Sequence, residues 1–167
     1  MRQELIKDLY SAPIVLAQGQ QNDSKYLPYP WPYNPLAAPN QDHPIGSAVG
    51  SVHFQFVSPI DTLKNKVKKT ILVQSSSLSK IEGIPSIISL SSATEPVKPS
   101  VFTDSKQTLG VLLEGRFSSL YTNRIKPFDW KPKEIQSARM AIFSDGNLLE
   151  NQIDKGQPLE LGYDKWT

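Results

Sequence analysis

Apolar residues along this chain fall into short runs, and each run predicts a buried β-strand. Turn-forming or polar residues separate the runs, as expected where strands are joined by loops. Several runs are apolar at every position, which is typical of strands in a sheet that is covered on both faces. The predicted strands are Pro13–Ala17, Thr70–Gln74, Ile84–Leu90, Gln107–Leu113 and Ala138–Phe143.

One further segment, residues 51–58, alternates between apolar and polar residues. Val52, Phe54 and Phe56 would share one face of a strand, and His53 would lie on the opposite, polar face. The alternation predicts a half-buried strand.

Helical patterns are short and few. Apolar residues recur on one side of Arg2–Leu9, which predicts a short helix there. A second short helix is predicted over Asn147–Ile153, with Ser144 or Asp145 as its N-cap.

A proline-rich block occupies Asn22–Pro44. Proline lacks a backbone N–H and fixes φ, so this density disfavours a helix or a central strand. The block is predicted to be an extended, partly polyproline-like loop. Its aromatic residues, Tyr26, Tyr29, Trp31 and Tyr33, would attach it to the body of the domain.

These elements predict an α/β or α+β domain with a mixed β-sheet and few helices. Parallel neighbours need a crossover segment, usually a helix, and the chain offers few candidates for one. Either the sheet is largely antiparallel in places, or helices outside this chain cover it.

Composition narrows the possibilities. The chain has 167 residues, which suggests one domain over 1–167, and its 38% hydrophobic content is that of a globular protein. It contains no cysteine, so disulfides, thiolate nucleophiles and cysteine zinc sites are excluded. The net charge of +2, from 18 basic and 16 acidic residues, argues against dedicated nucleic-acid binding. No run of 18 apolar residues and no signal peptide is visible.

Polar clusters follow three of the predicted strands. If these strands are parallel neighbours, Ser75, Glu114, Arg116 and Asp145 would converge on one rim of the sheet and form a ligand site. In the alternative interpretation, Asp145 only caps the next helix, and Glu114 and Arg116 form a structural ion pair.

The proline-rich block provides a second candidate site. Exposed aromatic side chains such as Trp31 and Tyr33 would offer flat faces to sugars or peptides. Alternatively, these rings are buried and anchor a long loop.

Other chemistry has less support. His43 and His53 have no ligand-like spacing with each other or with a carboxylate, so neither a metal site nor a cofactor is expected. The chain has no G-x-S-x-G, no G-x-G-x-x-G and no phosphate loop. The lysine cluster Lys64–Lys69 could contact phosphate or an acidic partner, or could be a solvated turn.

Several stretches together resemble a known family. They are KDLYSAPIVLAQGQ, LPYPWPYNPL followed by HPI, LLEGRFSSLYTNR, SDGNLLENQ and GQPLELGYDKWT. In this order they resemble GldG, an auxiliary component of a gliding-motility-associated ABC transporter of the Bacteroidetes. This component was formerly called the substrate-binding component. The resemblance covers residues 1–167, and its most specific parts are Leu112–Arg124 and Leu161–Trp166.

The resemblance implies a non-catalytic domain on the periplasmic side of the inner membrane, in a protein anchored by terminal hydrophobic helices. It implies an architecture related to the three-layer class I glutamine amidotransferases. The implied partners are the permease and ATPase subunits of the transporter, and carbohydrate or an envelope protein is a possible ligand. The implied physiology is gliding and the secretion of surface adhesins.

The resemblance also implies that the chain is part of a longer protein. Compared with the family pattern, the sequence lacks the membrane helices and the amino-terminal half of the extracytoplasmic region. It stops at 164–167, where the family pattern continues. We therefore expect an excised segment that contacts the membrane only through flanking helices.

An enzyme of amidotransferase-like or serine hydrolase type is the alternative function. With no cysteine, its nucleophile would be a hydroxyl such as that of Ser75, Ser76 or Ser144. That hydroxyl would have to lie within hydrogen-bonding distance of His43 or His53. A third possibility is a freestanding cytoplasmic protein.

Overall fold

The structure, a computed structural model, describes residues 4–19, 25–119, 121, 124–125, 128–129, 137–161 and 163. Strands dominate the described residues, and the only helices among them are three short 3-10 turns. The strands are β1 (Glu4–Asp8), β2 (Ser11–Gln18), β3 (Lys25–Pro39), β4 (Val52–His53), β5 (Lys68–Gln74), β6 (Ser79–Gly83), β7 (Thr108–Gly115), β8 (Ala138–Phe143), β9 (Ile153–Asp154) and β10 (Gln157–Pro158). The 3-10 helices are η1 (Leu90–Thr94), η2 (Pro99–Val101) and η3 (Asn147–Leu149).

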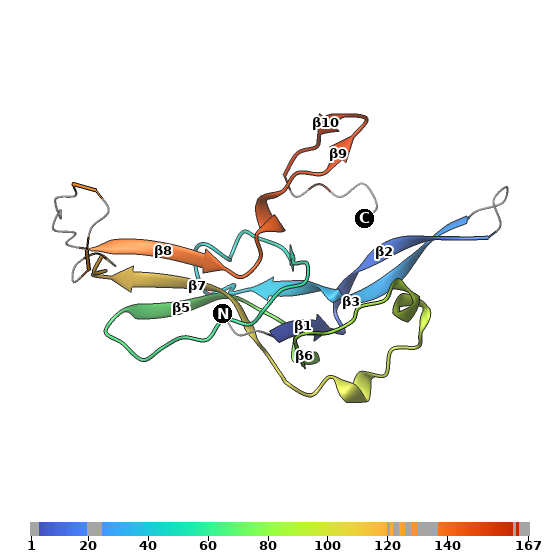
Figure 1. Cartoon of the computed structure of the whole chain (residues 1–167), viewed down its shortest axis with the longest axis horizontal. Helices are drawn as coiled ribbons and strands as arrows, with labels where there is room; N and C mark the ends of the chain where they lie inside the picture. The colour runs from blue at the N-terminus through green and yellow to red at the C-terminus, as the bar shows by residue number, and fades with distance from the viewer. Residues whose placement is uncertain are drawn as a thin grey trace.

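The main sheet has six strands. Its order is β2-β3-β5-β7-β8, with β4 paired to β3. Two small ribbons, β1–β6 and β9–β10, complete the described pairings, all of which are antiparallel. Figure 1 shows β5, β7 and β8 side by side at one end of an elongated molecule, with the β2–β3 ribbon at the other end. The predicted sheet with few helices is confirmed, and an antiparallel sheet needs no crossover helices.

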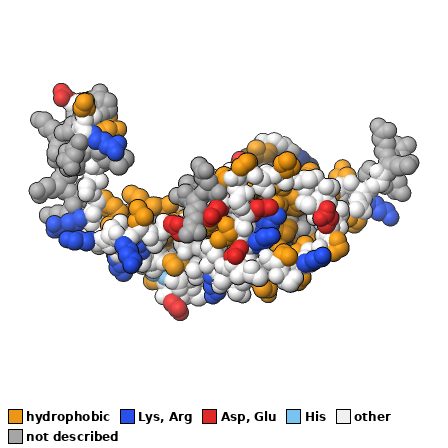
Figure 2. Space-filling view, turned by 60° about the horizontal axis from the view of Figure 1, so that its bottom comes forward, with side chains coloured by type: hydrophobic (Ala, Val, Ile, Leu, Met, Phe, Trp, Pro, Cys, Tyr) orange, Lys and Arg blue, Asp and Glu red, His pale blue; other side chains and the backbone are white. Residues whose placement is uncertain are grey.

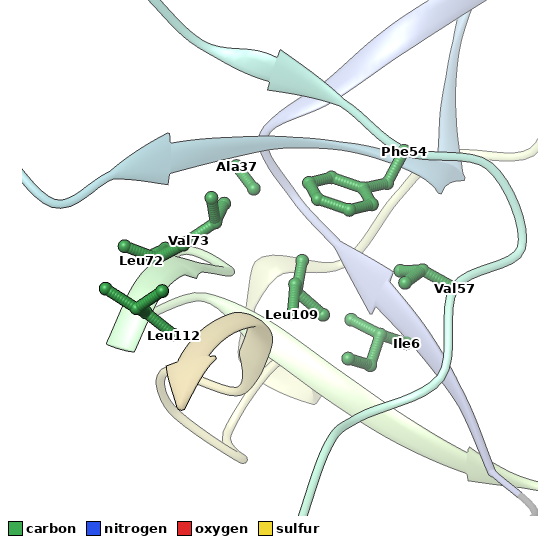
Figure 3. Packing of buried hydrophobic residues seen from close by; sticks show 8 residues of the cluster. All are labelled: Ile6, Ala37, Phe54, Val57, Leu72, Val73, Leu109 and Leu112. Carbon is green, nitrogen blue, oxygen red and sulfur yellow. The ribbon is translucent and has the colours of Figure 1, made fainter. Parts of the chain in front are cut away.

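The core lies where the ends of β5 and β7 meet β1, β3 and the loop after β4. Its side chains are aliphatic apart from one phenylalanine and are 6% exposed or less (Figure 3): Ile6, Ala37, Phe54, Val57, Leu72, Val73, Leu109 and Leu112. They come from segments far apart in sequence, so hydrophobic burial at this point holds both halves of the sheet together.

β3 corrects the prediction of a proline-rich loop. Lys25–Pro39 is a continuous strand that pairs with β2 at Lys25–Pro30 and Pro35 and with β4 and β5 at its end. Pro28, Pro30 and Pro32 recur at every second residue, so their missing N–H groups all fall on one edge of the strand. Pro30 lies opposite Pro13, and a pair with no N–H on either side must be of the type that makes no mutual hydrogen bonds. The residues between the prolines keep their N–H groups for pairing with β2.

Four predicted strands are confirmed, since β2, β5, β7 and β8 coincide with the apolar runs that predicted them. The predicted amino-terminal helix is wrong. Glu4–Asp8 forms β1 and pairs residue by residue with β6. Because Ile6 is completely buried in this pairing, tertiary contacts override the weak helical pattern.

The predicted strand Ile84–Leu90 is also wrong. The segment from Ile84 onward leaves the β1–β6 ribbon through a cis Ile84–Pro85 peptide bond and reaches η1. Ile87 is almost fully exposed, and Ile88 packs against Trp31 and Tyr33 of β3 without forming a strand. β6, which no apolar run predicted, lies just before this segment.

The alternating segment 51–58 forms a strand only at β4. Phe54 is completely buried as predicted, whereas Phe56 has a φ of 48° and is 49% exposed. A left-handed residue breaks the two-residue period, so Val57 takes the next core position. The predicted helix over Asn147–Ile153 is confirmed only as the single turn η3, because β9 begins at Ile153.

Candidate functional site

An open cleft of about 590 Å³ lies between the main sheet and the segment that follows β8. One wall comes from the start of β2, from β3 and from β4, and the other comes from residues 145–163. Aliphatic side chains such as Leu36, Val52 and Leu148 line it together with polar ones. The polar side chains of the lining include His53, Gln55, Asp145, Asn147, Glu150, Asn151, Gln152 and Tyr163.

Asp145 joins the two walls of this cleft. Its Oδ2 accepts a hydrogen bond of 2.6 Å from the backbone N–H of Gln55, and its Oδ1 accepts one of 2.8 Å from the N–H of Asn147. The N-cap of η3 is Gly146 and has no side-chain cap, so the predicted N-cap at Ser144 or Asp145 is wrong, although the Asp145 carboxylate still accepts from the first N–H of η3. Because the first contact spans 90 residues of sequence, Asp145 also sets the distance between the walls.

The far wall is rich in amide and carboxylate side chains. The run from Asn147 to Gln152 contributes two asparagines, a glutamine and Glu150, and Tyr163 adds a ring that is 58% exposed. The Asn151 Nδ2 group donates a 2.7 Å hydrogen bond to the backbone oxygen of Leu159, which fixes that amide and leaves its Oδ1 available to a ligand. Amides beside an aromatic ring and an aliphatic floor suit a neutral ligand rich in hydroxyl or peptide groups.

Trp31 and Tyr33 lie away from this cleft and are buried, with 2% and 5% of their surface exposed. Their ring centroids are 5.2 Å apart, and the ring of Phe56 stacks on Tyr33 at 5.8 Å. The anchoring interpretation of these two residues is therefore favoured over a flat binding face. They anchor a strand, β3, and not a loop.

A lysine and a glutamate complete the surroundings of Tyr33. Lys7 Nζ lies 2.9 Å from Glu82 Oε2 and 4.6 Å from the centre of the Tyr33 ring, and Tyr33 Oη donates to the same carboxylate at 2.9 Å. Burial alone would raise the pKa of Glu82, but hydrogen bonds from Lys7 and Tyr33 outweigh it and hold that pKa below 4.5. The same hydrogen bonds offset the burial of Lys7 and raise its pKa. Burial raises the pKa of the Tyr33 hydroxyl.

Glu82→Gln is expected to lower the free energy of unfolding by about 1 kcal/mol at pH 7, because the side chain is partly exposed and its ion pair is partly screened. The folded-state pKa of Glu82 lies below 4.5, so its contribution is present above that pH and is lost as pH falls through the folded value. The difference between the two proteins should therefore shrink at pH 3. Urea unfolding at both pH values tests this, with the exposed Glu95→Gln as the control. An equal difference at both pH values would contradict it.

Ser75 is a structural residue at the end of β5. It is 1% exposed, and its Oγ accepts a hydrogen bond of 2.8 Å from the N–H of Gln107. In turn, the Ser75 N–H donates a 2.9 Å hydrogen bond to the backbone oxygen of Gln107. This exchange extends the β5–β7 pairing by one step.

Glu114 and Arg116 lie at the opposite end of the sheet from Ser75. β5, β7 and β8 are antiparallel, so the expectation that Ser75, Glu114, Arg116 and Asp145 meet on one rim is wrong. Glu114 pairs across the strands, with its carboxylate oxygens 2.9 Å from Lys68 Nζ and 3.0 Å from Arg139 Nε. The apolar runs specified the strands but carried no information about their direction.

The hydroxyls that could serve an enzyme are directed elsewhere. Ser76 Oγ donates to the Asp8 carboxylate at 2.6 Å, and Ser144 Oγ donates to the Leu109 oxygen at 3.2 Å. His43 Nδ1 accepts from the N–H of Ile45 at 3.2 Å. Within the described ranges, no group of three or more His, Asp or Glu could hold a metal ion, and no helix is long and apolar enough to cross a membrane.

Sequence reasoning did not select most of the cleft. Of its polar residues, Asp145 alone was a candidate site residue. The available signal was the amide-rich run Asn147–Gln152, which had predicted a short helix and not a ligand site. Its position opposite β4 follows from the chain path after β8, which has no local signature.

Fold and cleft define a class: an antiparallel β-domain with an open, polar cleft between its sheet and its carboxy-terminal segment. The chain belongs to the family described as ABC-type uncharacterized transport system, an auxiliary component, and the family model matches residues 1–167. An accessory role in an ABC transport system follows from this membership, and so does association with transporter components. No curated protein and no solved structure matches the chain.

Proposed function

We propose that this chain is a non-enzymatic accessory domain of a gliding-motility-associated ABC transporter, similar to GldG. It would act on the periplasmic side of the inner membrane as part of a longer, membrane-anchored protein. The family match over residues 1–167 carries this proposal, because it places the whole chain in an auxiliary transport component. The permease and the ATPase would be the partners of the full-length protein.

The cleft is the surface that we assign to a ligand, either a glycan or an envelope protein. Its amides and carboxylates can hydrogen-bond with hydroxyl or peptide groups, and Tyr163 offers a ring face at the rim. Asp145 is committed to Gln55 and Asn147, so it would shape the cleft more than contact the ligand.

Affinity purification of the tagged full-length protein tests the accessory role. We expect the permease and ATPase to co-purify, and we expect deletion of the parent gene to abolish gliding while leaving growth intact. Recovery of neither subunit after crosslinking would overturn the proposed partnership.

A matched pair of variants tests the cleft. Glu150→Ala/Tyr163→Ala removes two exposed cleft side chains, and Glu95→Ala/Tyr26→Ala removes the same side-chain types from exposed positions elsewhere. In glycan arrays and envelope-protein pull-downs, the first variant should bind at least about tenfold more weakly and the second should bind normally. Equal binding by both variants would exclude the cleft as the site.

A further inference from the structure

One end of the main sheet concentrates positive charge. The antiparallel pairing of β5, β7 and β8 brings together the loop before β5, the end of β7 and the start of β8 (Figure 1). We call this region the basic end. Its described residues include seven basic side chains, Lys64, Lys66, Lys68, Lys69, Arg116, Arg124 and Arg139, and two acidic ones, Glu114 and Asp129.

This concentration is not a property of the chain as a whole. The chain carries 18 basic and 16 acidic residues, so the residues outside this set comprise 11 basic and 14 acidic ones. Figure 2 shows several Lys and Arg side chains at the end of the molecule that holds β7 and β8. Glu114 is already paired with Lys68 and Arg139, and it neutralises only part of the local charge.

Exposed apolar side chains adjoin these cations along the chain. Leu63, in the loop before β5, is 81% exposed, and Ile125, in the connection from β7 to β8, is 97% exposed. Phe128 and Met140 are about half exposed, at 57% and 47%. Single exposed apolar side chains occur elsewhere on this chain as well, and what distinguishes these is that they adjoin a concentration of cations.

We propose that the basic end docks on an anionic phospholipid surface. Cations beside exposed aliphatic and aromatic side chains are the combination that binds a membrane interface, because headgroups attract the charges and the acyl boundary accepts the apolar groups. An acidic protein would satisfy the charges but would give no role to isolated Leu63 and Ile125. The proposal does not depend on the cleft, which is lined by other residues.

Flotation with vesicles tests the proposal on the 167-residue chain. We expect binding to vesicles of phosphatidylcholine with about one third phosphatidylglycerol, little binding to phosphatidylcholine alone, and loss of most binding at about 1 M salt. Binding to both vesicle types alike, or to neither, would overturn the proposal. Binding only to an acidic protein probe such as polyglutamate would also overturn it.

Charge-matched variants locate the surface. Lys64→Gln/Lys66→Gln should weaken binding about 25-fold, since each basic residue near an anionic surface contributes about fivefold. Lys25→Gln/Lys98→Gln changes the net charge equally at exposed sites outside the basic end and should change binding less than about twofold. Equal losses of binding in the two variants would show that the net charge of the whole molecule drives binding, and would contradict the basic end as the docking surface.

Leu63→Ser tests the apolar part. The substitution should weaken vesicle binding several-fold. The ratio of parent to variant binding should stay the same as the salt concentration rises, because salt screens charges and not the apolar contribution. No loss would overturn the insertion of Leu63. Circular dichroism should confirm that all variants keep their fold, as expected for exposed side chains.

Discussion

Asp8→Ala is expected to lower the free energy of unfolding by about 3–5 kcal/mol. The Asp8 side chain is completely buried at the end of β1. Its carboxylate accepts three hydrogen bonds, from the Ser76 N–H at 2.7 Å, from Ser76 Oγ at 2.6 Å and from the Tyr10 N–H at 2.9 Å. Alanine would remove the acceptor of these three part-buried hydrogen bonds, and each donor that water does not reach costs about 1–3 kcal/mol when left unsatisfied.

Urea unfolding measures this loss. Asp42→Ala, at an exposed position in the loop after β3, should change the unfolding free energy by less than about 0.5 kcal/mol. Asp8→Asn keeps one acceptor oxygen and should fall between the two. A loss below about 1 kcal/mol for Asp8→Ala would show that the turn between β1 and β2 does not depend on this carboxylate.

Phe54→Ala should destabilise the protein by a comparable amount, about 3–5 kcal/mol. Phe54 is completely buried and is the largest side chain of the core cluster. Its removal forfeits the burial of the ring and leaves a cavity between β3, β5 and β7, which the strands cannot close without breaking their pairing.

The effect should extend to the cleft, because Phe54 lies between His53 and Gln55, both of which line it. We expect weaker ligand binding by this variant even below its unfolding transition. Phe128→Ala, at a 57% exposed position, should leave stability within about 1 kcal/mol of the parent chain. A small stability loss for Phe54→Ala would mean that the core can collapse around the missing ring.

The apolar runs predicted four strands of the main sheet, although burial does not explain all of them: β7 has a run of four buried residues, whereas β8 has none. No apolar run predicted β1 or β6. β1 is short and carries charges at both ends, and each strand of this ribbon is stabilised by the other. The segment that forms β3 was predicted as a loop because it contains many prolines. The two-residue spacing of these prolines, which a strand tolerates, did not enter that prediction. The sequence alone shows that Pro28, Pro30 and Pro32 are two residues apart, so that in a strand their backbone nitrogens face the same edge.

The site was less predictable than the fold. Strand direction determines which strand ends share a rim, and apolar patterning is the same for parallel and antiparallel neighbours. Asp145 lines the cleft, whereas Glu114 and Arg116 lie at the other end of the sheet and Ser75 closes the β5–β7 pairing. The role of these residues in ligand binding stays a prediction, as does the amidotransferase-like architecture.

The spacing of prolines in β3 has a consequence for self-association. Residues in pairs without mutual hydrogen bonds direct their backbone groups away from the partner strand, so Pro28 and Pro30 face the edge of β3 that is turned away from β2. Only every second residue directs its backbone groups to that edge, and at Pro28 and Pro30 these residues have no N–H, so a strand from another molecule would find no donor there for its acceptors. A long ribbon that projects from the domain would otherwise offer a template for aggregation. The prolines therefore let the β2–β3 ribbon project from the domain without pairing with strands of other molecules.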